Sequence, residues 1–305
     1  MMTYLIGVDG GGSGTRVRLA RLAPGSNPLH YIELAEGTAG PSALSQGVTA
    51  AWDTIGAAVA QAFQNAALVQ PPHDAIAIGL GMAGVHNASW AQAFLDADPG
   101  YGFCALAHDG YTTLIGAHGG QPGAVIALGT GSVGQALLAD GSQRAVGGWG
   151  FPSGDEGSGA WIGMAAINYL QQTLDGRLEG GPLADELAAF CGGSRPAIQD
   201  WLAGATAPRF ATLAPLVVHH ADAEDEAACE IMASAGYEVD LMAAALDPDY
   251  TLPLALCGGL GAAMVPWLDV ETVEMIVTAQ GDSAAGALRM VATQLQDRAA
   301  GASAT

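Results

Sequence analysis

The sequence predicts an α/β fold built from two lobes of related architecture. Apolar runs typical of buried strands alternate with helical patterns in the first 120 residues. A strand, a glycine turn and a second strand open the chain, and the same order of elements returns at 123–140. Two such units indicate a duplicated architecture. A ligand held by both turns would lie in a cleft between the lobes, where ligand sites are favoured.

Residue spacing predicts the elements of the first lobe. In the stretch 47–68, apolar residues such as Trp52, Ile55 and Val59 recur at helical spacing. Short apolar runs that end in glycine indicate buried strands. In chain order we expect strands at 4–9, 15–22 and 30–37, a helix at 47–68, a strand at 75–84, a helix at 89–97, a strand at 103–110 and a helix through "YTTLIGAHGG".

The second lobe begins with "GAVIALGTGSVGQALLAD" at 123–140, which contains an apolar strand, a turn and an alternating strand. Near the end of the chain, "LPLALCGGLGAAMVPWL" at 252–268 predicts a strand that runs into glycines and then a helix. We expect an N-terminal lobe at 1–112, completed by a C-terminal helix at about 286–300, and a C-terminal lobe at 113–285.

Composition excludes several classes of protein. The 305 residues include nine basic and thirty acidic side chains, a net charge of −21, which argues against binding to nucleic acid or anionic membranes. All nine basic residues are arginines, so mechanisms that need a lysine, such as a Walker-type phosphate site, are excluded. No signal peptide or membrane-length apolar run is recognised, and the four scattered cysteines form no CxxC pair, so we expect a cytoplasmic protein with reduced thiols.

The opening stretch "IGVDGGGSGTRVRLARL" carries the first chemical signal. A plain hairpin turn needs only one or two glycines, whereas Asp9 is followed by four glycines and a serine. Bare backbone amides suit a phosphate group, and a carboxylate beside a phosphate requires a cation between them. The stretch therefore admits two interpretations, a turn or a phosphate site that uses Mg²⁺.

Five motifs in order carry a resemblance to a known family. They are "DGGGSGTR", "LGTGS", "GGWGFPSGDEGSGAWIG", "APRFATLAPLVVHHA" and "CGGLGAAM", with "GDSAAGALRM" near the end of the chain. The sequence resembles the actin-like ATPase superfamily, which implies a two-lobed, ribonuclease H-like fold with duplicated mixed-sheet domains. Within it, the chain resembles the BadF/BadG/BcrA/BcrD-type ATPases and, among these, the amino-sugar kinases.

The resemblance implies roles for the glycine motifs. Asp9 would position Mg²⁺ through its water shell. Three glycine motifs would bind ATP: Gly11, Gly12 and Ser13 with the Thr15 hydroxyl, then Gly129, Thr130, Gly131 and Ser132, and for the adenosine Gly258, Gly259 and Gly261. Each motif also has a structural interpretation. Thr15 could be an ordinary strand residue, residues 129–132 a simple hairpin turn, and the glycines at 258–261 positions where helices pack.

The resemblance also implies a sugar site. Asp109 in "LAHDG" would be the catalytic base, and Asp155 would bind sugar hydroxyls with help from Glu156; helix capping is the alternative for these acids. Gly148 and Trp149 would line the pocket. The family pattern Gly-x-x-Asn is broken here, because "GPSAL" has Ala43 at the asparagine position, so either Ser42 contacts the sugar or that hydrogen bond is missing.

The activity implied is transfer of the ATP γ-phosphoryl group to the 6-hydroxyl of a hexosamine, with ATP and Mg²⁺ as cofactors. Glucosamine is the first expectation and N-acetylglucosamine, or a glucokinase-like substrate, the second. An ATP-driven conformational switch or activator ATPase is the alternative from a different class. The expected partners are an amino sugar and ATP, with no nucleic acid and no membrane, and a homodimer is left open.

Overall fold

The structure is a computed structural model that describes residues 2–22 and 27–303. The chain divides into two compact units. Unit 1 comprises Met1–Gln121 with Ala279–Thr305, and unit 2 is Pro122–Thr278. The expected boundaries at 112 and 285 therefore shift. A boundary at 112 would have cut through helix α3 (Asp109–His118), and residues 279–285 belong to unit 1 because they lead into the long helix α12 (Ser283–Ser303).

Unit 1 is built on a five-stranded sheet in the order β3-β2-β1-β4-β5. Strands β1 and β2 form an antiparallel hairpin and β3 continues it, whereas β4 and β5 run parallel to β1. The parallel strands are joined by helices, as parallel connections require. The strands are β1 (Tyr4–Gly10), β2 (Thr15–Leu22), β3 (Tyr31–Ala39), β4 (Ile76–Met82) and β5 (Phe103–His108), and the helices are α1 (Val48–Asn65), α2 (Ala88–Asp96), α3 and α12.

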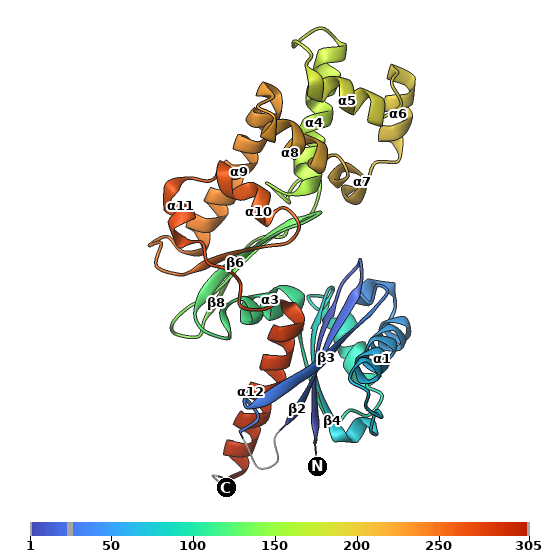
Figure 1. The fold of residues 1–305 in the computed structure, drawn as a ribbon, viewed down its shortest axis with the longest axis vertical. Coiled ribbons are helices and arrows are strands. Elements are labelled where there is room, and N and C mark those ends of the chain that lie inside the picture. Colours follow the sequence, from blue (N-terminus) through green and yellow to red (C-terminus); the bar gives the residue numbers. More distant parts are fainter. Residues whose placement is uncertain (1, 23–26, 304–305) are drawn as a thin grey trace. The chain divides into compact units, whose positions relative to one another are not determined.

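Helices cover both faces of this sheet (Figure 1). Alternate residues of β1 point to opposite faces, so Ile6 and Val8 pack against α1, whereas Leu5 packs against α12. The helix α12 approaches the sheet at two glycines that are partners in the β1–β4 register, Gly7 and Gly79. A Cβ at either position would lie 2.1 Å from a backbone oxygen of α12, so only glycine allows this contact.

Unit 2 repeats this strand arrangement in a smaller sheet. Its order is β8-β7-β6-β9, with β6 antiparallel to β7 and parallel to β9, which matches β3-β2-β1-β4 of unit 1. The strands are β6 (Gly123–Leu128), β7 (Ser132–Leu137), β8 (Gln143–Gly147) and β9 (Leu254–Cys257). The duplicated α/β architecture predicted from the two strand–turn–strand units is confirmed.

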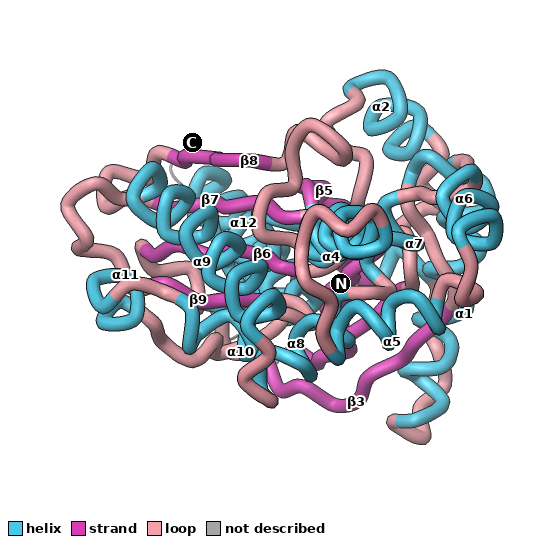
Figure 2. The backbone as a smooth tube through the Cα atoms, turned by 90° about the horizontal axis from the view of Figure 1, so that it is seen from above, coloured by secondary structure: helices cyan, strands magenta, loops and turns pink. Residues whose placement is uncertain are grey.

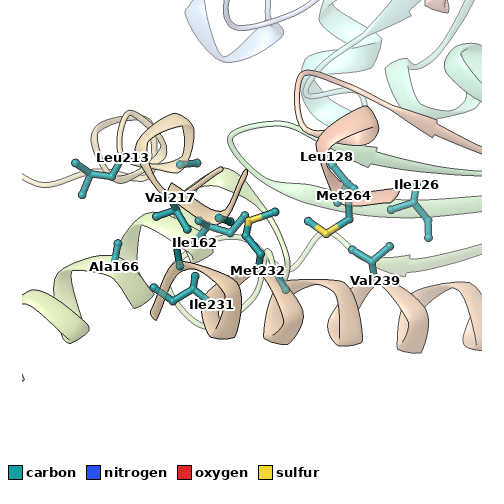
Figure 3. Close-up of a cluster of buried hydrophobic side chains, with 14 of the residues drawn as sticks. Ile126, Leu128, Ile162, Ala166, Leu213, Val217, Ile231, Met232, Val239 and Met264 are labelled. Atoms are coloured by element: carbon teal, nitrogen blue, oxygen red, sulfur yellow. The ribbon is translucent and has the colours of Figure 1, made fainter. Parts of the chain in front are cut away.

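Helices make up most of unit 2. The long helix α9 (Glu226–Leu246) lies along the strands of the sheet (Figure 2), and Val239 and Met232 belong to one apolar core with Ile126 and Leu128 of β6 (Figure 3). The other helices are α4 (Gly159–Leu174), α5 (Pro182–Phe190), α6 (Arg195–Ala203), α7 (Ala207–Ala211), α8 (Ala214–Asp222), α10 (Gly261–Met264) and α11 (Val270–Met275). The sequence patterns predicted neither β8 nor the helices α5, α6, α7, α8, α9 and α11.

Candidate active site

The parallel strands of unit 1 bring two carboxylates to one edge of the sheet. Asp9 lies near the end of β1, and Asp109 directly follows β5. In the register, Asp9 is opposite Gly81 of β4, and Gly81 is opposite Ala107 of β5. Two strand spacings separate β1 from β5, which is roughly 10 Å between their backbones. This edge is where open α/β sheets place their ligands.

Asp9 is partly buried and lies near two other negatively charged side chains. Burial has the largest influence and raises the pKa of Asp9, and the carboxylates of Asp109 and Asp282 act in the same direction. A hydrogen bond with the Ser283 side chain and the charge of Arg16 oppose the increase. A cation beside Asp9 would stabilise its ionised form.

The donor set at Asp9 fits an ion held mainly by water and phosphate. No group of three or more His, Cys, Asp or Glu side chains with metal-binding geometry occurs in the described part of the chain. Mg²⁺ commonly keeps several waters and is bound by one or two carboxylates together with substrate phosphates. A single partly buried carboxylate next to a glycine turn matches that pattern.

Two hydroxyl groups connect the Asp9 carboxylate with the backbone carbonyl of Asp109. The Oγ atoms of Ser283 and Thr112 are 2.8 Å apart, and Thr112 Oγ1 lies 2.9 Å from the Asp109 carbonyl, to which it can donate. Ser283 and Thr112 are both buried. Sequence reasoning missed Ser283, although "GDSAAGALRM" contained it, because no local pattern shows that the start of α12 reaches the end of β1.

Asp282, next to Ser283, binds two of the nine arginines. It accepts hydrogen bonds from Arg16 Nη1 and Arg18 Nε, both at 2.9 Å, and from the Ala285 amide at the start of α12. Burial would raise the pKa of Asp282, but the bonds from Arg18, Ala285 and Arg16 together hold it below its ordinary value. The ion pairs fasten the start of α12 to β2.

Asp109 is not the N-cap of α3. The N-cap is His108, whose Nδ1 accepts from the Tyr111 amide at 3.0 Å, and burial lowers the pKa of His108, which keeps the ring neutral for this role. The half-buried Asp109 occupies the first turn, where its Oδ1 accepts from the Gly110 amide at 2.9 Å. The capping alternative is therefore wrong for Asp109, and its second carboxylate oxygen is not committed to a cap.

The first glycine turn differs in detail from the expectation. The Gly11 amide donates to the Gly14 carbonyl at 3.0 Å, so it closes the turn and cannot also bind phosphate. Gly12 and Ser13 are exposed at the tip. Next to them, Asp9, Ser13, Arg16 and four neighbouring residues line an open cavity of about 260 Å³.

Thr15 and Ser42 are committed to each other in the interior. Their hydroxyls are 2.6 Å apart, Thr15 Oγ1 also lies 2.8 Å from the Gly40 carbonyl, and Ser42 is fully buried. The expected contact of Ser42 with the sugar is corrected, because Ser42 offers no surface to a ligand. Thr15 lines the cavity beside Asp9, but its hydroxyl is bonded to Gly40 and Ser42. The pair instead holds the 40–42 loop against β2, and Ala43 beside it is also buried.

In unit 2 the second glycine turn lies on the first residues of α4. The amides of Gly159 and Ala160 donate to the carbonyls of Gly129 and Thr130 at 2.8 and 3.1 Å. These bonds satisfy two of the amides that a helix start leaves unpaired. Because its carbonyls face α4, the turn directs the amides of Thr130 and Gly131 away from α4, and neither has a protein acceptor among the described residues.

Ser132 does not fit its expected phosphate role. It is buried, its hydroxyl donates to the Glu156 carbonyl at 2.7 Å, and its amide donates to Asp155 Oδ1 at 3.3 Å. The hydroxyl is therefore committed within the protein, whereas the amide makes only the long bond to Asp155. The Gly129 amide donates to the Gly131 carbonyl at 2.9 Å, so this turn leaves the amides of the exposed Thr130 and of Gly131 for an anion.

Two motifs expected in one sugar pocket differ in exposure. Asp155 and Glu156 are half-buried beside the second turn, and Ser158, not an acid, caps α4 through the Trp161 amide. Trp149 is 85% exposed and Gly148 is exposed as well, so neither is packed in the interior of unit 2.

The parallel pairing of β6 with β9 brings the third glycine motif next to the second. The Leu260 amide donates to the Leu128 carbonyl at 3.1 Å, directly before the second turn. Gly258, with φ +87°, and Gly259 are exposed, whereas Gly261 is buried at the start of α10 and offers no surface to a ligand. The expected adenosine role is thus restricted to Gly258 and Gly259.

Three relatives of known name resemble this chain. The glucosamine kinase of Vibrio cholerae is 29% identical over 287 residues, 94% of this chain and 95% of that protein. The N-acetylmuramic acid/N-acetylglucosamine kinase of Clostridium acetobutylicum is 28% identical over 194 residues, 62% and 60% of the two chains. The crystal structure of a candidate N-acetylglucosamine kinase from Chromobacterium violaceum is 49% identical, with a TM-score of 0.88 over 95% of this chain and 99% of that one.

Among the described residues, no helix is both long and apolar enough to span a membrane.

The profile of the BadF/BadG/BcrA/BcrD ATPase family matches residues 6–290, from the first strand to the middle of the last helix. That range contains both glycine turns, both carboxylates of the sheet edge and the loop that carries Asp155 and Glu156, here called the acidic loop. The chain belongs to the BadF/BadG/BcrA/BcrD ATPase family.

Proposed function

We propose that this protein is an ATP-dependent kinase that phosphorylates the 6-hydroxyl of a hexosamine, with glucosamine as the preferred substrate and N-acetylglucosamine as the second. The observation that carries the proposal is the placement of Asp9 and Asp109 at one edge of a parallel sheet, next to a glycine turn. The names of the relatives, a glucosamine kinase among them, support the class of substrate.

In this proposal Asp109 accepts the proton of the attacking hydroxyl. Phosphoryl transfer requires little covalent chemistry from the protein. The protein therefore accelerates the reaction mainly by positioning the reactants and stabilising the charge of the transition state. Asp109 lies in the first turn of α3, and the Thr112 hydroxyl next to its carbonyl fixes the backbone there. The carboxylate of Asp155 would bind sugar hydroxyls.

The candidate phosphate ligands are the backbone amides of Gly12 and Ser13 in the first glycine turn and those of Thr130 and Gly131 in the second. Mg²⁺, when bound through water to Asp9, would neutralise charge on the transferred group. Arg16 lines the same cavity as Asp9 and supplies a positive charge that the absent lysines cannot. Since ATP is the proposed donor, the proposal also places the enzyme in the cytoplasm.

The test is ADP release from ATP with a panel of sugars. Glucosamine should raise the rate far above that with ATP alone, whereas 6-deoxyglucosamine, which lacks the acceptor hydroxyl, should not. A rate of ATP turnover that no sugar changes would contradict the kinase proposal and favour a conformational switch.

A further inference from the structure

The acidic loop contacts the second glycine turn more closely than separate sugar and phosphate sites require. A Cβ added to Gly131 would lie 2.9 Å from the carboxyl carbon and from both carboxylate oxygens of Asp155. The same carboxylate accepts a hydrogen bond from the Ser132 amide at 3.3 Å. The Asp155 side chain therefore covers Gly131 and its neighbouring amide.

The backbone of the acidic loop is fixed, but the Asp155 carboxylate is only weakly held. Ser132 Oγ donates to the Glu156 carbonyl at 2.7 Å, and the Ser158 amide donates to the Asp155 carbonyl at 3.1 Å. Asp155 also has φ +63°, a conformation in which aspartate is one of the tolerated residues. Among the described residues, the carboxylate itself accepts only the long bond from Ser132. A rotation about χ1 can move it without disturbing the loop.

The turn that Asp155 covers is suited to an anion. Its carbonyls are bonded to the first amides of α4, so its own amides face away, and the start of a sixteen-residue helix adds a partial positive charge. A carboxylate at this position supplies the negative charge that a phosphate would otherwise bring. A phosphate on this turn and the Asp155 carboxylate would repel each other, because both are negatively charged.

We propose that Asp155 couples the two substrates of the kinase. With no sugar bound, its carboxylate lies on Gly131 and the Ser132 amide and opposes binding of the terminal phosphate of the nucleotide. Sugar hydroxyls, or the ammonium group of glucosamine, draw the carboxylate away and uncover the turn. The inference rests on the proposed function, and it explains how ATP could be protected from hydrolysis until the sugar has bound.

The test measures nucleotide affinity in the absence of sugar by titration calorimetry. Asp155→Asn keeps the side-chain shape and tolerates the same φ, but it removes the charge. It should bind a non-hydrolysable ATP analogue about tenfold more tightly than the wild type, the change that 1.4 kcal/mol of relieved repulsion gives. Affinity for ADP, which lacks the terminal phosphate, should not change. Asp155→Gly, which accepts the same φ, repeats the measurement without the side chain.

Asp140→Asn is the matched control, because it makes the same change in net charge in the exposed β7–β8 turn of the same unit. Its affinities should equal those of the wild type. In the wild type, saturating glucosamine should tighten binding of the ATP analogue, and Asp155→Asn should abolish that effect.

Unchanged affinity of both Asp155 variants for the ATP analogue would overturn the inference and leave Asp155 as a sugar ligand only. Equal tightening by Asp140→Asn would also overturn it, because net charge would then explain the effect. Failure of the proposed function is a separate result: the wild type would phosphorylate no sugar of the panel, whatever its nucleotide affinities.

Discussion

At the scale of single residues, Asp109 and Ser283 have the most specific roles at the edge of the first sheet. Asp109 lies at the junction of β5 and α3, with a backbone fixed by Thr112 and a carboxylate that caps no helix. Ser283 lies between Thr112 and Asp9. Substitution of Asp109 is predicted to slow phosphoryl transfer. Substitution of Ser283 is predicted to change the pH dependence of metal–nucleotide binding.

Asp109→Asn should reduce kcat by at least about 10²-fold, the usual contribution of a general base. The amide has the same shape, so thermal stability and the affinity for the ATP analogue should stay at wild-type values. Steady-state kinetics together with calorimetry separate these effects. Turnover close to that of the wild type would remove Asp109 from the mechanism.

Ser283→Ala should raise the pKa of Asp9 further, because the hydroxyl lowers it in the wild type. Only the ionised carboxylate attracts a cation, so metal–nucleotide binding is present above the pKa of Asp9 and is lost as pH falls through it. The acid limb of the affinity–pH profile for Mg²⁺ with the ATP analogue should therefore move to higher pH. Ser89→Ala, in an exposed turn of α2, is the control. An unmoved acid limb would show that Ser283 does not act on Asp9.

At the scale of elements, the packing of α12 on the first sheet depends on glycine. Gly79→Ala would place a methyl group 2.1 Å from the Ala287 carbonyl, so α12 must shift, and we expect a loss of about 1–3 kcal/mol in the free energy of unfolding. Gly56→Ala on α1 meets no atom within 4 Å and should stabilise the helix by up to about 1 kcal/mol. Urea denaturation measures both. Equal effects of the two changes would contradict this account of α12.

The short helix α11 is fastened to α9 by Asp240. Asp240 is 8% exposed, its Oδ2 accepts from the Asp269 amide at 3.0 Å, and its Oδ1 has no partner among the described residues. Burial raises the pKa of Asp240, and the nearby charges of Asp269 and Glu271 add to this, while hydrogen bonds from Thr272 and the Asp269 amide oppose it. Because the pKa is higher in the folded state, this contact stabilises most at acid pH and weakens as pH rises through that pKa.

Hydrogen-exchange protection of the α11 amides, corrected for intrinsic rates, should therefore fall as pH rises above the ordinary aspartate range. Asp240→Asn should make the protection independent of pH over this interval. A pH dependence that persists in the Asn variant would assign it to another group.

Local periodicity predicted the elements of unit 1, whereas it missed most helices of unit 2 and all long-range contacts. The spacing of Trp52, Ile55 and Val59 predicted α1, and the recurring strand–turn–strand unit predicted the duplicated sheets. Burial of Ser42 could not be foreseen, because its partner Thr15 is 27 residues away. The contact of Ser283 with Thr112 spans 171 residues, which no local pattern reveals.

At the scale of the whole molecule, the net charge of −21 bears on the choice of sugar. The ammonium group of glucosamine is attracted to carboxylates such as Asp155, and acetylation removes that charge. We predict a kcat/KM for glucosamine about tenfold or more above that for N-acetylglucosamine, or about 1.4 kcal/mol in transition-state stabilisation. The preference should weaken at high salt, because salt screens partly solvated charges. Steady-state kinetics with both sugars at low and high ionic strength measure this preference. A higher kcat/KM for N-acetylglucosamine would reverse the assignment of the preferred substrate but leave the kinase proposal intact.

The central claim is that the protein transfers phosphate from ATP to the 6-hydroxyl of a hexosamine. Phosphorus NMR of a reaction with ATP, Mg²⁺ and glucosamine tests it most directly, because it distinguishes a sugar phosphate ester from free phosphate and reports how much ADP accompanies each. We predict glucosamine 6-phosphate and ADP in equal amounts, with little inorganic phosphate. ADP accompanied by inorganic phosphate alone, at the same rate with and without the sugar, would contradict the claim.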